Sequence, residues 1–254
     1  MRILLANDDG IKAPGLHALA EALEPLAELY VVAPAREQSG TGHGITVRDP
    51  IRVRDYQIAG VKQSWVVAGT PADCVKIALA RLVPENIDLV VAGINHGANL
   101  GSDVLYSGTV SAAAEGVVMG CPSIAFSLNS HDRHADMGMA AQFAHTLIGQ
   151  YGAMDIVPGE LLNVNFPSLM QSELQGVRFT RLGRRSYGNM FEERLDPMGN
   201  RYFWMGGGLL DLEQESDSDV RAVNEGYISI TPLSLDFTDF RSLELYRRRS
   251  DIEI

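Results

Sequence analysis

Residues 3–10, Ile3-Leu4-Leu5-Ala6-Asn7-Asp8-Asp9-Gly10, join a short apolar run to a turn that carries two adjacent carboxylates. An uninterrupted apolar run of this length is typical of a parallel strand that is buried on both faces. Asp8 and Asp9 would then lie at the carboxyl end of that strand, where α/β proteins usually bind their ligands. Paired carboxylates there favour a divalent cation and a phosphate substrate, although Asp-Gly is also an ordinary turn signal.

Short apolar runs of the same kind recur through the first two-thirds of the chain. Between them lie segments with helical spacing of apolar residues or with helix-start signals, such as Thr70 as N-cap and Pro71 at the first helical position. Alternating strands and helices predict right-handed βαβ units, and therefore a Rossmann-like α/β fold with a mostly parallel sheet flanked by helices. The expected strands are Ile3–Ala6, Leu29–Ala33, Trp65–Ala68, Leu89–Ala92, Ser123–Phe126 and Leu161–Phe166, and the expected helices begin near Pro14, Thr70, Thr109 and Asp136.

Two regions depart from this alternation. Residues 45–56 alternate apolar and polar side chains, which predicts a half-exposed antiparallel strand. After Pro167 the sequence predicts short strands over residues 177–180, 201–205 and 227–231, and a solvated loop over the acid-rich stretch 211–219, but no long helix. We therefore predict a single domain over residues 1–254, in which residues 1–167 form the α/β catalytic core and residues 168–254 a β-rich extension for oligomerisation.

Composition narrows the class of partner. The 254 residues carry a formal net charge of −11, which argues against a nucleic-acid polymer as ligand because polyphosphate backbones are bound by basic surfaces. The sequence has no apolar run of the ~18–20 residues that a membrane span needs, and the polar residues from Asn7 onward interrupt any export signal. We therefore expect a cytoplasmic protein without membrane contact. Its two cysteines, Cys74 and Cys121, form no zinc signature, and Cys74 is expected to be a small buried residue.

Two further loops follow predicted strand ends. The glycine-rich loop, residues 34–44, would let backbone N–H groups near Ser39 and Gly40 approach an anion, although flexibility without function is an equal alternative. The second loop, residues 93–108, leads into a helix predicted to begin near Thr109, so Ser107, Gly108 and Thr109 lie at the helix start. Free N–H groups and hydroxyls there favour phosphate binding, and simple capping of the helix by Ser107 or Thr109 is the alternative. Neither loop matches a dinucleotide-binding or P-loop motif, which disfavours a dehydrogenase.

The three loops leave the same edge of the predicted sheet and should converge. Their side chains then bring together Asp8, Asp9, Ser39 and Asn95, which offer two carboxylates, a hydroxyl and an amide oxygen. Hard oxygen ligands of this kind suit Mg²⁺, Mn²⁺ or Ca²⁺ rather than zinc.

These motifs, taken in order, resemble the SurE survival-protein phosphatases. The resemblance implies a metal-dependent nucleotidase that acts on nucleoside 5′- and 3′-monophosphates and in some members on short polyphosphate. Ala92 stands where the family often has serine, and the acid-rich stretch 211–219 is unusual. The matching motifs are Asn7–Gly10, Val32–Pro34 with Gln38–Gly40, Gly69–Val75, Gly93–Asn95 through Tyr106–Val110, and Gly226–Leu233.

The resemblance also implies site residues and assembly. The family's metal ligands, for one cation per subunit (Mg²⁺ or Mn²⁺), fall on Asp8, Asp9, Ser39 and Asn95. Its phosphate-binding segment falls on Ser107, Gly108 and Thr109, and we add Asn95 and Gly40 from the neighbouring loops. The family fold exchanges its C-terminal extension between subunits, so a homodimer or homotetramer is expected.

The expected chemistry is metal-assisted hydrolysis of a phosphomonoester, with Asp8 and Asp9 as catalytic carboxylates and Asp9 preferred for orienting the water. Attack by Asp8 on phosphorus is a mechanistic alternative, although the adjacent pair lacks the Asp-x-Asp spacing typical of that chemistry. A nucleotide-binding regulatory module without turnover is the alternative from another class.

Overall fold

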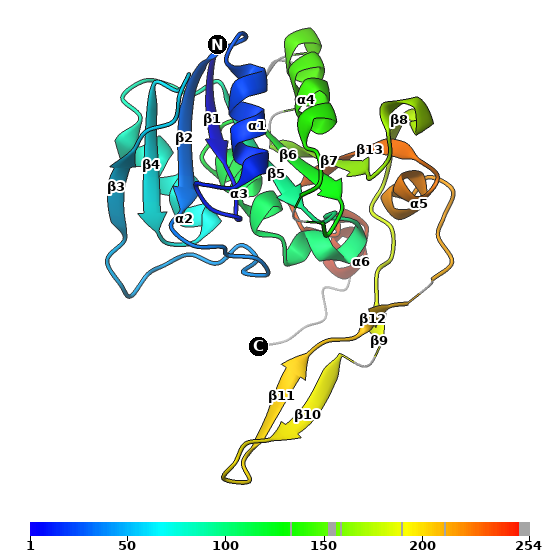
Figure 1. Ribbon diagram of the computed structural model, residues 1–254. Coiled ribbons are helices and arrows are strands. Elements are labelled where there is room, and N and C mark those ends of the chain that lie inside the picture. Colours follow the sequence, from blue (N-terminus) through cyan, green and yellow to red (C-terminus); the bar gives the residue numbers. More distant parts are fainter. Residues whose placement is uncertain (133, 152–155, 158, 189, 211, 249–254) are drawn as a thin grey trace.

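A nine-stranded sheet forms the centre of the molecule in the computed structural model, with helices on both faces (Figure 1). Its strand order is β3-β4-β2-β1-β5-β6-β7-β13-β8. The structure describes residues 1–132, 134–151, 156–157, 159–188, 190–210 and 212–248. The mostly parallel, helix-flanked architecture confirms the predicted fold class.

The six strands predicted for the first two-thirds of the chain all form, and they pair parallel to one another. Their interior positions are almost fully buried, as expected for strands covered on both faces. The alternating segment 45–56 behaves as predicted only in its second half: β3 (Arg52–Tyr56) is a largely exposed edge strand antiparallel to β4, whereas residues 45–51 form no strand. The parallel strands are β1 (Arg2–Ala6), β2 (Glu28–Pro34), β4 (Gln63–Ala68), β5 (Leu89–His96), β6 (Ser123–Asn129) and β7 (Glu160–Pro167).

The predicted helices cover the two faces of this sheet. α1 (Pro14–Leu23) and α4 (Gly138–Tyr151) pack on one apolar cluster, and α2 (Pro71–Ile77), η1 (Ala78–Leu82) and α3 (Gly108–Val118) pack on the other. α2 starts as its sequence indicates, because Thr70 and Asp73 form a complete capping box. Cys74 on α2 is buried and burial raises the pKa of its thiol, which confirms its structural role.

The chain after Pro167 divides into a part that joins the sheet and a part that leaves it. β13 (Tyr227–Ser234) pairs antiparallel to β7 and parallel to β8 (Gly176–Phe179), so the central sheet continues past residue 167. The short helix η3 (Gln171–Glu173) lies between β7 and β8, and after β8 the chain extends into an arm before it returns to β13. The arm consists of the hairpin β10 (Phe191–Leu195) and β11 (Arg201–Met205), with β9 (Tyr187–Gly188) and β12 (Gly208–Leu209) paired at its base (Figure 1).

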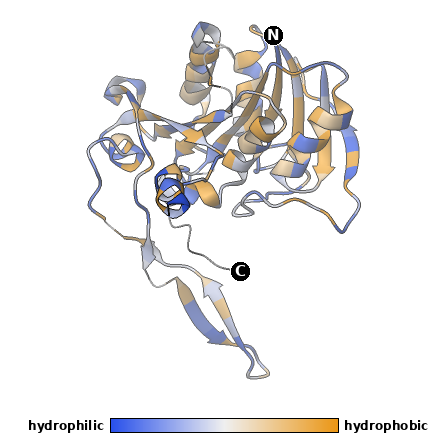
Figure 2. Cartoon of the chain, turned by 180° about the vertical axis from the view of Figure 1, so that it is seen from behind, coloured by the Kyte–Doolittle hydropathy of each residue, from blue (hydrophilic) through white to orange (hydrophobic). Residues whose placement is uncertain are grey.

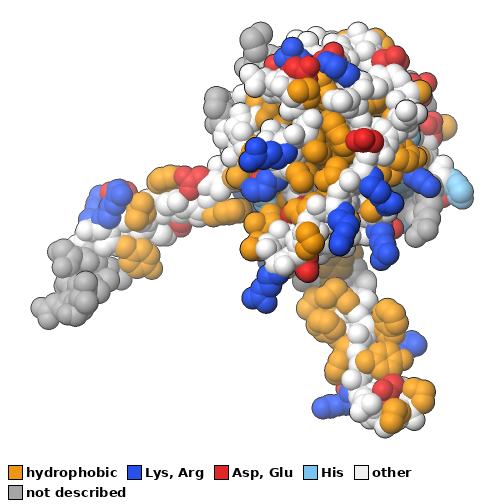
Figure 3. All heavy atoms as spheres, turned by 90° about the vertical axis from the view of Figure 1, so that its left-hand side faces the viewer, with side chains coloured by type: hydrophobic (Ala, Val, Ile, Leu, Met, Phe, Trp, Pro, Cys, Tyr) orange, Lys and Arg blue, Asp and Glu red, His pale blue; other side chains and the backbone are white. Residues whose placement is uncertain are grey.

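The apolar side chains of the arm strands are not buried against the rest of the described chain. All residues of β10 and β11 are exposed, and the space-filling view shows hydrophobic side chains along the projection (Figure 3). In contrast, hydrophobic residues colour the strands of the central sheet, where they are enclosed by helices (Figure 2). The exposed side chains of the two arm strands include Phe191, Leu195, Phe203, Trp204 and Met205.

The C-terminal part contains two short helices that the sequence pattern did not predict, α5 (Asp219–Asn224) and α6 (Phe240–Arg247), and no long helix among its described residues. One prediction for this part is wrong. The acid-rich stretch is not solvated throughout, because the Asp219 side chain is fully buried and accepts N–H hydrogen bonds from Gly101 and Gly183. Residue 211, also part of that stretch, lies outside the described residues. Within the described residues, no helix has the length and apolar character needed to cross a membrane.

Candidate active site

The turn after β1 is built by Asn7. Its buried side chain donates to the Gly10 carbonyl at 2.9 Å and accepts the Gly10 N–H at 3.2 Å. Gly10 has a φ of +99°, a backbone conformation that favours glycine. The turn therefore presents Asp8 and Asp9 at the carboxyl end of β1.

Asp8 is packed directly against the start of α3. The Thr109 hydroxyl donates a hydrogen bond to Asp8 Oδ1, and the Asp8 side chain is buried. A Cβ atom placed on Gly108 would lie 2.6 Å from the Asp8 Cβ. Only glycine at position 108 lets the first turn of this helix approach so closely, so Gly108 and Thr109 set the position of Asp8.

The carboxylate pair is poorly compensated by other protein groups. Burial raises the pKa of Asp8, against the lowering effect of the Thr109 hydroxyl. Burial, followed by the negative charge of Asp8, raises the pKa of Asp9 to about 7, and a hydrogen bond from the backbone of His96 opposes that shift. In the part of the chain that the structure describes, neither carboxylate forms an ion pair, and Asp9 Oδ2 is buried without a hydrogen-bond partner. Such a pair favours a bound cation.

The glycine-rich loop contacts this pair as the topology predicts. The Gln38 N–H donates to the Asp8 carbonyl at 2.8 Å, which brings Ser39 to the same edge of the sheet. Ser39 is exposed, and its hydroxyl donates to Glu37 Oε1 at 3.0 Å. The negative charge of Glu37 contributes to the raised pKa of both Asp8 and Asp9, so Glu37 is a nearby acidic residue that sequence reasoning missed.

Asn95 lies at the end of β5, next to the residue whose backbone contacts Asp9. It is buried, and its amide nitrogen donates to the Gly97 carbonyl at 2.7 Å. This bond leaves the amide oxygen of Asn95 as the atom that could bind a cation. The pairing of β5 with β6 shifts register between Ala92 and Asn95, which distinguishes this strand end from the regular pairing before it.

The Ser107–Thr109 segment shows a structural role for both hydroxyls. Ser107 is the N-cap of α3, and its Oγ accepts the Val110 N–H at 3.0 Å. Thr109 uses its hydroxyl to hold Asp8. The capping interpretation is therefore correct for Ser107, and the contact with phosphate stays a prediction for Ser107, Gly108 and Thr109. Gly40, the remaining predicted contact, is exposed in the glycine-rich loop, and its Cβ position is open.

The donor chemistry fits a hard cation. Among the described residues no group of three or more His, Cys, Asp and Glu side chains could hold a metal ion. A cation at Asp8 and Asp9 must therefore complete its coordination with neutral oxygens, and Ser39 and Asn95 supply that type of atom. The unpartnered Asp9 Oδ2 is the observation that best supports this fit.

Comparison with known proteins agrees with the fold and the motifs. The profile described as survival protein SurE matches residues 3–189. The chain belongs to the SurE family. A protein of Syntrophomonas wolfei named 5′-nucleotidase SurE is 58% identical over 248 residues, which cover 98% of this chain and 94% of that protein. A protein of Heliobacterium modesticaldum with the same name is 47% identical over 245 residues, which cover 96% of this chain and 90% of that protein.

A solved SurE structure has the same architecture. The crystal structure of the SurE protein from Aquifex aeolicus superposes with a TM-score of 0.85 at 37% sequence identity. The match covers 99% of this chain and 100% of that one. The resemblance read from the motifs, and the SurE fold implied by it, are thus confirmed.

Proposed function

We propose that this SurE-family protein is a divalent-metal-dependent phosphomonoesterase that hydrolyses nucleoside 5′- and 3′-monophosphates and also accepts short polyphosphate. The uncompensated pair of buried Asp8 and half-buried Asp9, next to the N-terminus of α3, is the observation that carries this proposal. The name 5′-nucleotidase borne by relatives of nearly equal length supports turnover over the alternative of a regulatory module that only binds nucleotides.

In this proposal Asp8, Asp9, Ser39 and Asn95 hold one Mg²⁺ or Mn²⁺. When bound, the cation supplies Lewis acidity and charge neutralisation for phosphate oxygens. Thr109 keeps Asp8 in place through its hydroxyl. We assign to Asp9, beside the cation, the orientation of the attacking water.

The phosphate is bound by the start of α3 and by the loops beside it. The helix N-terminus favours negative charge, and the glycines at 40 and 108 permit close approach of the main chain. Asn95 and the Ser107–Thr109 segment complete the phosphate-binding site in the proposal. Most of the rate acceleration then comes from positioning and electrostatic stabilisation, as phosphoryl transfer generally requires.

We also propose that the protein is a cytoplasmic homodimer or homotetramer. The exposed apolar side chains of β10 and β11 support assembly through the arm, since long apolar hairpins left in water favour pairing. The net charge of −11 supports a small anionic substrate rather than a nucleic-acid polymer.

Phosphate release from nucleoside monophosphates tests the function. Protein stripped with chelator should release phosphate only after Mn²⁺ or Mg²⁺ is restored. Tight nucleotide binding without phosphate release under every metal condition would instead establish the regulatory alternative.

A further inference from the structure

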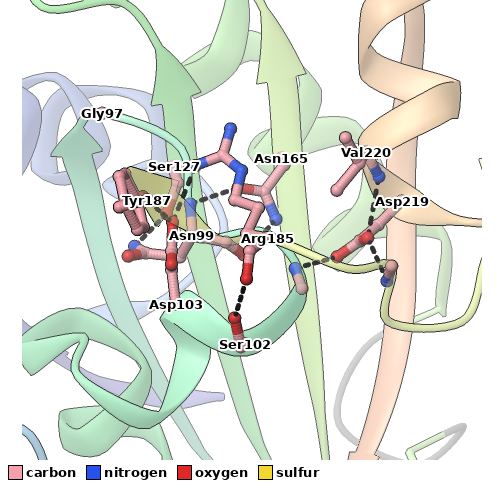
Figure 4. Close-up of polar contacts among 12 residues, drawn as sticks. Gly97, Asn99, Ser102, Asp103, Ser127, Asn165, Arg185, Tyr187, Asp219 and Val220 are labelled. Carbon is pink, nitrogen blue, oxygen red and sulfur yellow. Dashed lines mark hydrogen bonds and ion pairs between the residues drawn. The ribbon is translucent and has the colours of Figure 1, made fainter. Parts of the chain in front are cut away.

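The loop that connects β5 to α3 (residues 97–107, the β5–α3 loop) is fastened to the C-terminal half of the chain. Its first part is fixed inside the core by Asn99, whose amide nitrogen donates to Ser127 Oγ at 2.7 Å and whose backbone N–H donates to Asn165 at 2.8 Å. Gly101 then donates its N–H to Asp219 at 2.9 Å (Figure 4). These contacts place the loop but do not reach Ser107.

The last part of the loop is held by two side chains of the short helix η2 (Gly101–Leu105). The Ser102 hydroxyl donates to the Arg185 carbonyl at 3.1 Å, and Asp103 binds the side chains of Arg185 and Tyr187. Asp103 Oδ2 accepts from Arg185 Nη1 at 2.8 Å and from the Tyr187 hydroxyl at 2.6 Å (Figure 4). The Arg185 and Asp103 side chains are only 14% and 17% exposed, so solvent screens this ion pair less than a surface pair. Burial, followed by the hydrogen bond to Asp103, raises the pKa of Tyr187, which keeps its phenol a donor at neutral pH.

The backbone of the same residue continues the connection toward the site. The Asp103 carbonyl accepts the N–H of Tyr106 at 3.0 Å and the N–H of Ser107 at 3.1 Å. Ser107 in turn caps α3, and the first turn of α3 packs against Asp8. The Tyr106 carbonyl also accepts the Gly42 N–H at 3.0 Å, which ties in the glycine-rich loop.

We propose that Asp103 is a positioning residue for the phosphate site: Arg185 and Tyr187 hold its side chain, and its carbonyl holds the main chain that delivers Ser107. The inference rests on the proposed function for the meaning of that site. Because Tyr187 belongs to β9 at the base of the arm, Asp103 also links the arm to the start of α3. Among the described residues, none of these three side chains forms a hydrogen bond or ion pair with Asp8 or Asp9, so their effect on turnover is indirect.

Tyr187→Phe is the sharpest test, because it removes one hydroxyl and keeps the ring. We expect kcat/KM for a nucleoside monophosphate to fall about tenfold, since small misplacements remote from the chemistry can cost up to ~10²-fold. Inhibition by inorganic phosphate should weaken similarly, whereas Mn²⁺ affinity should change less than about twofold, because both carboxylates remain in place. Tyr56→Phe, on the edge strand β3, is the matched control. Its kcat/KM, phosphate inhibition and Mn²⁺ affinity should equal those of the unmodified protein.

Hydrogen exchange supplies a measurement that does not depend on turnover. Amides in residues 101–110 should exchange at least about tenfold faster in Tyr187→Phe than in Tyr56→Phe, with exchange in β1 and β5 unchanged. In a double-mutant cycle, the loss of kcat/KM in the Asp103→Asn, Tyr187→Phe double variant should barely exceed the loss in Asp103→Asn alone. Unchanged exchange and unchanged phosphate inhibition in Tyr187→Phe would overturn the positioning role. If Tyr187→Phe speeds exchange but the unmodified protein shows no phosphatase activity, the positioning role is supported and the proposed function is refuted.

Discussion

The carboxyl edge of the sheet and the C-terminal arm make opposite use of their side chains. At the edge, polar residues such as Asn7, Asp8 and Asn95 are buried, and main-chain contacts from three loops hold them. In the arm, large apolar residues such as Phe203 and Trp204 are exposed. Burying charge and exposing apolar surface both cost free energy, so each region points to something that it binds. For the edge we propose a cation and a phosphate, and for the arm another copy of the chain.

The largest effect is expected from the carboxylate pair. Asp8→Asn or Asp9→Asn should lower turnover by roughly 10²-fold or more, on the scale of losing a major electrostatic contributor. The fold should persist, because each change relieves repulsion in the metal-free pair. Phosphate release and thermal unfolding measure the two effects. Asp55→Asn on the exposed edge strand β3 is the control, and near-normal activity in both site variants would remove the pair from the site.

A glycine substitution compares the two regions directly. Gly108→Ala places a Cβ 2.6 Å from that of Asp8, so the start of α3 must shift, and we expect about a tenfold loss of kcat/KM. Gly206→Ala in the arm meets nothing within 4 Å and should leave kinetics unchanged. Steady-state assays of the two variants decide whether close packing at Asp8 matters; equal activity would show that it does not.

Removal of the arm tests its role in assembly. Gly188 and Gly208 pair in the short β9–β12 ladder, so residues 189–207 can be replaced by an Asn-Gly turn without stretching the chain. We expect a folded protein that sediments as a smaller species and has several-fold lower activity because assembly is lost, although Tyr187 keeps its contact with Asp103. Sedimentation of the intact protein as a monomer at micromolar concentration, with full activity, would contradict the proposed assembly.

The acid-rich segment contains a smaller test of burial. Asp219→Asn should lower the free energy of unfolding by about 1–3 kcal/mol, because buried N–H groups of Gly101 and Gly183 lose a charged acceptor. Asp217→Asn, nearby but exposed, should change it by less than about 0.5 kcal/mol. Urea unfolding of both variants measures the difference, and equal values would mean that Asp219 contributes no more than a surface carboxylate.

The last test concerns pH and applies to protein kept in chelator. The pKa of Asp9 is about 7 in the folded chain against about 3.9 in an unfolded one, so the folded state binds more protons between these values. The contribution of Asp9 to stability is therefore greatest below about pH 4 and falls as pH rises through 7. Unfolding in urea from pH 5 to 8 should show a shallower decline in Asp9→Asn. Identical pH profiles for the two proteins would contradict the raised pKa.

The sequence predicted the parallel sheet and its helices because both rest on local signals. In a strand, a continuous apolar run such as Ile3–Ala6 puts apolar side chains on both faces, so both faces must be buried. The pair Thr70-Pro71 marks the start of a helix. The convergence of the loops at Asp8 and Asp9 also followed, since the carboxyl ends of parallel strands share one edge. The membership in the SurE family was readable from the same motifs.

Other features depend on contacts between residues far apart in the chain, which no local pattern records. The hydroxyl of Thr109 binds Asp8, 101 positions away, a contact that no local pattern predicted, and its role at phosphate stays a prediction. Asp219 looked like part of a solvated acidic loop, but Gly101 and Gly183 supply N–H groups that make its burial favourable. The joining of Asp103 to Arg185 and Tyr187 likewise exists only because the C-terminal segment returns to the sheet edge. Local propensity and burial patterns thus specified the elements and their edge, whereas the partners of each buried polar group were set only when the tertiary structure brought distant donors and acceptors together.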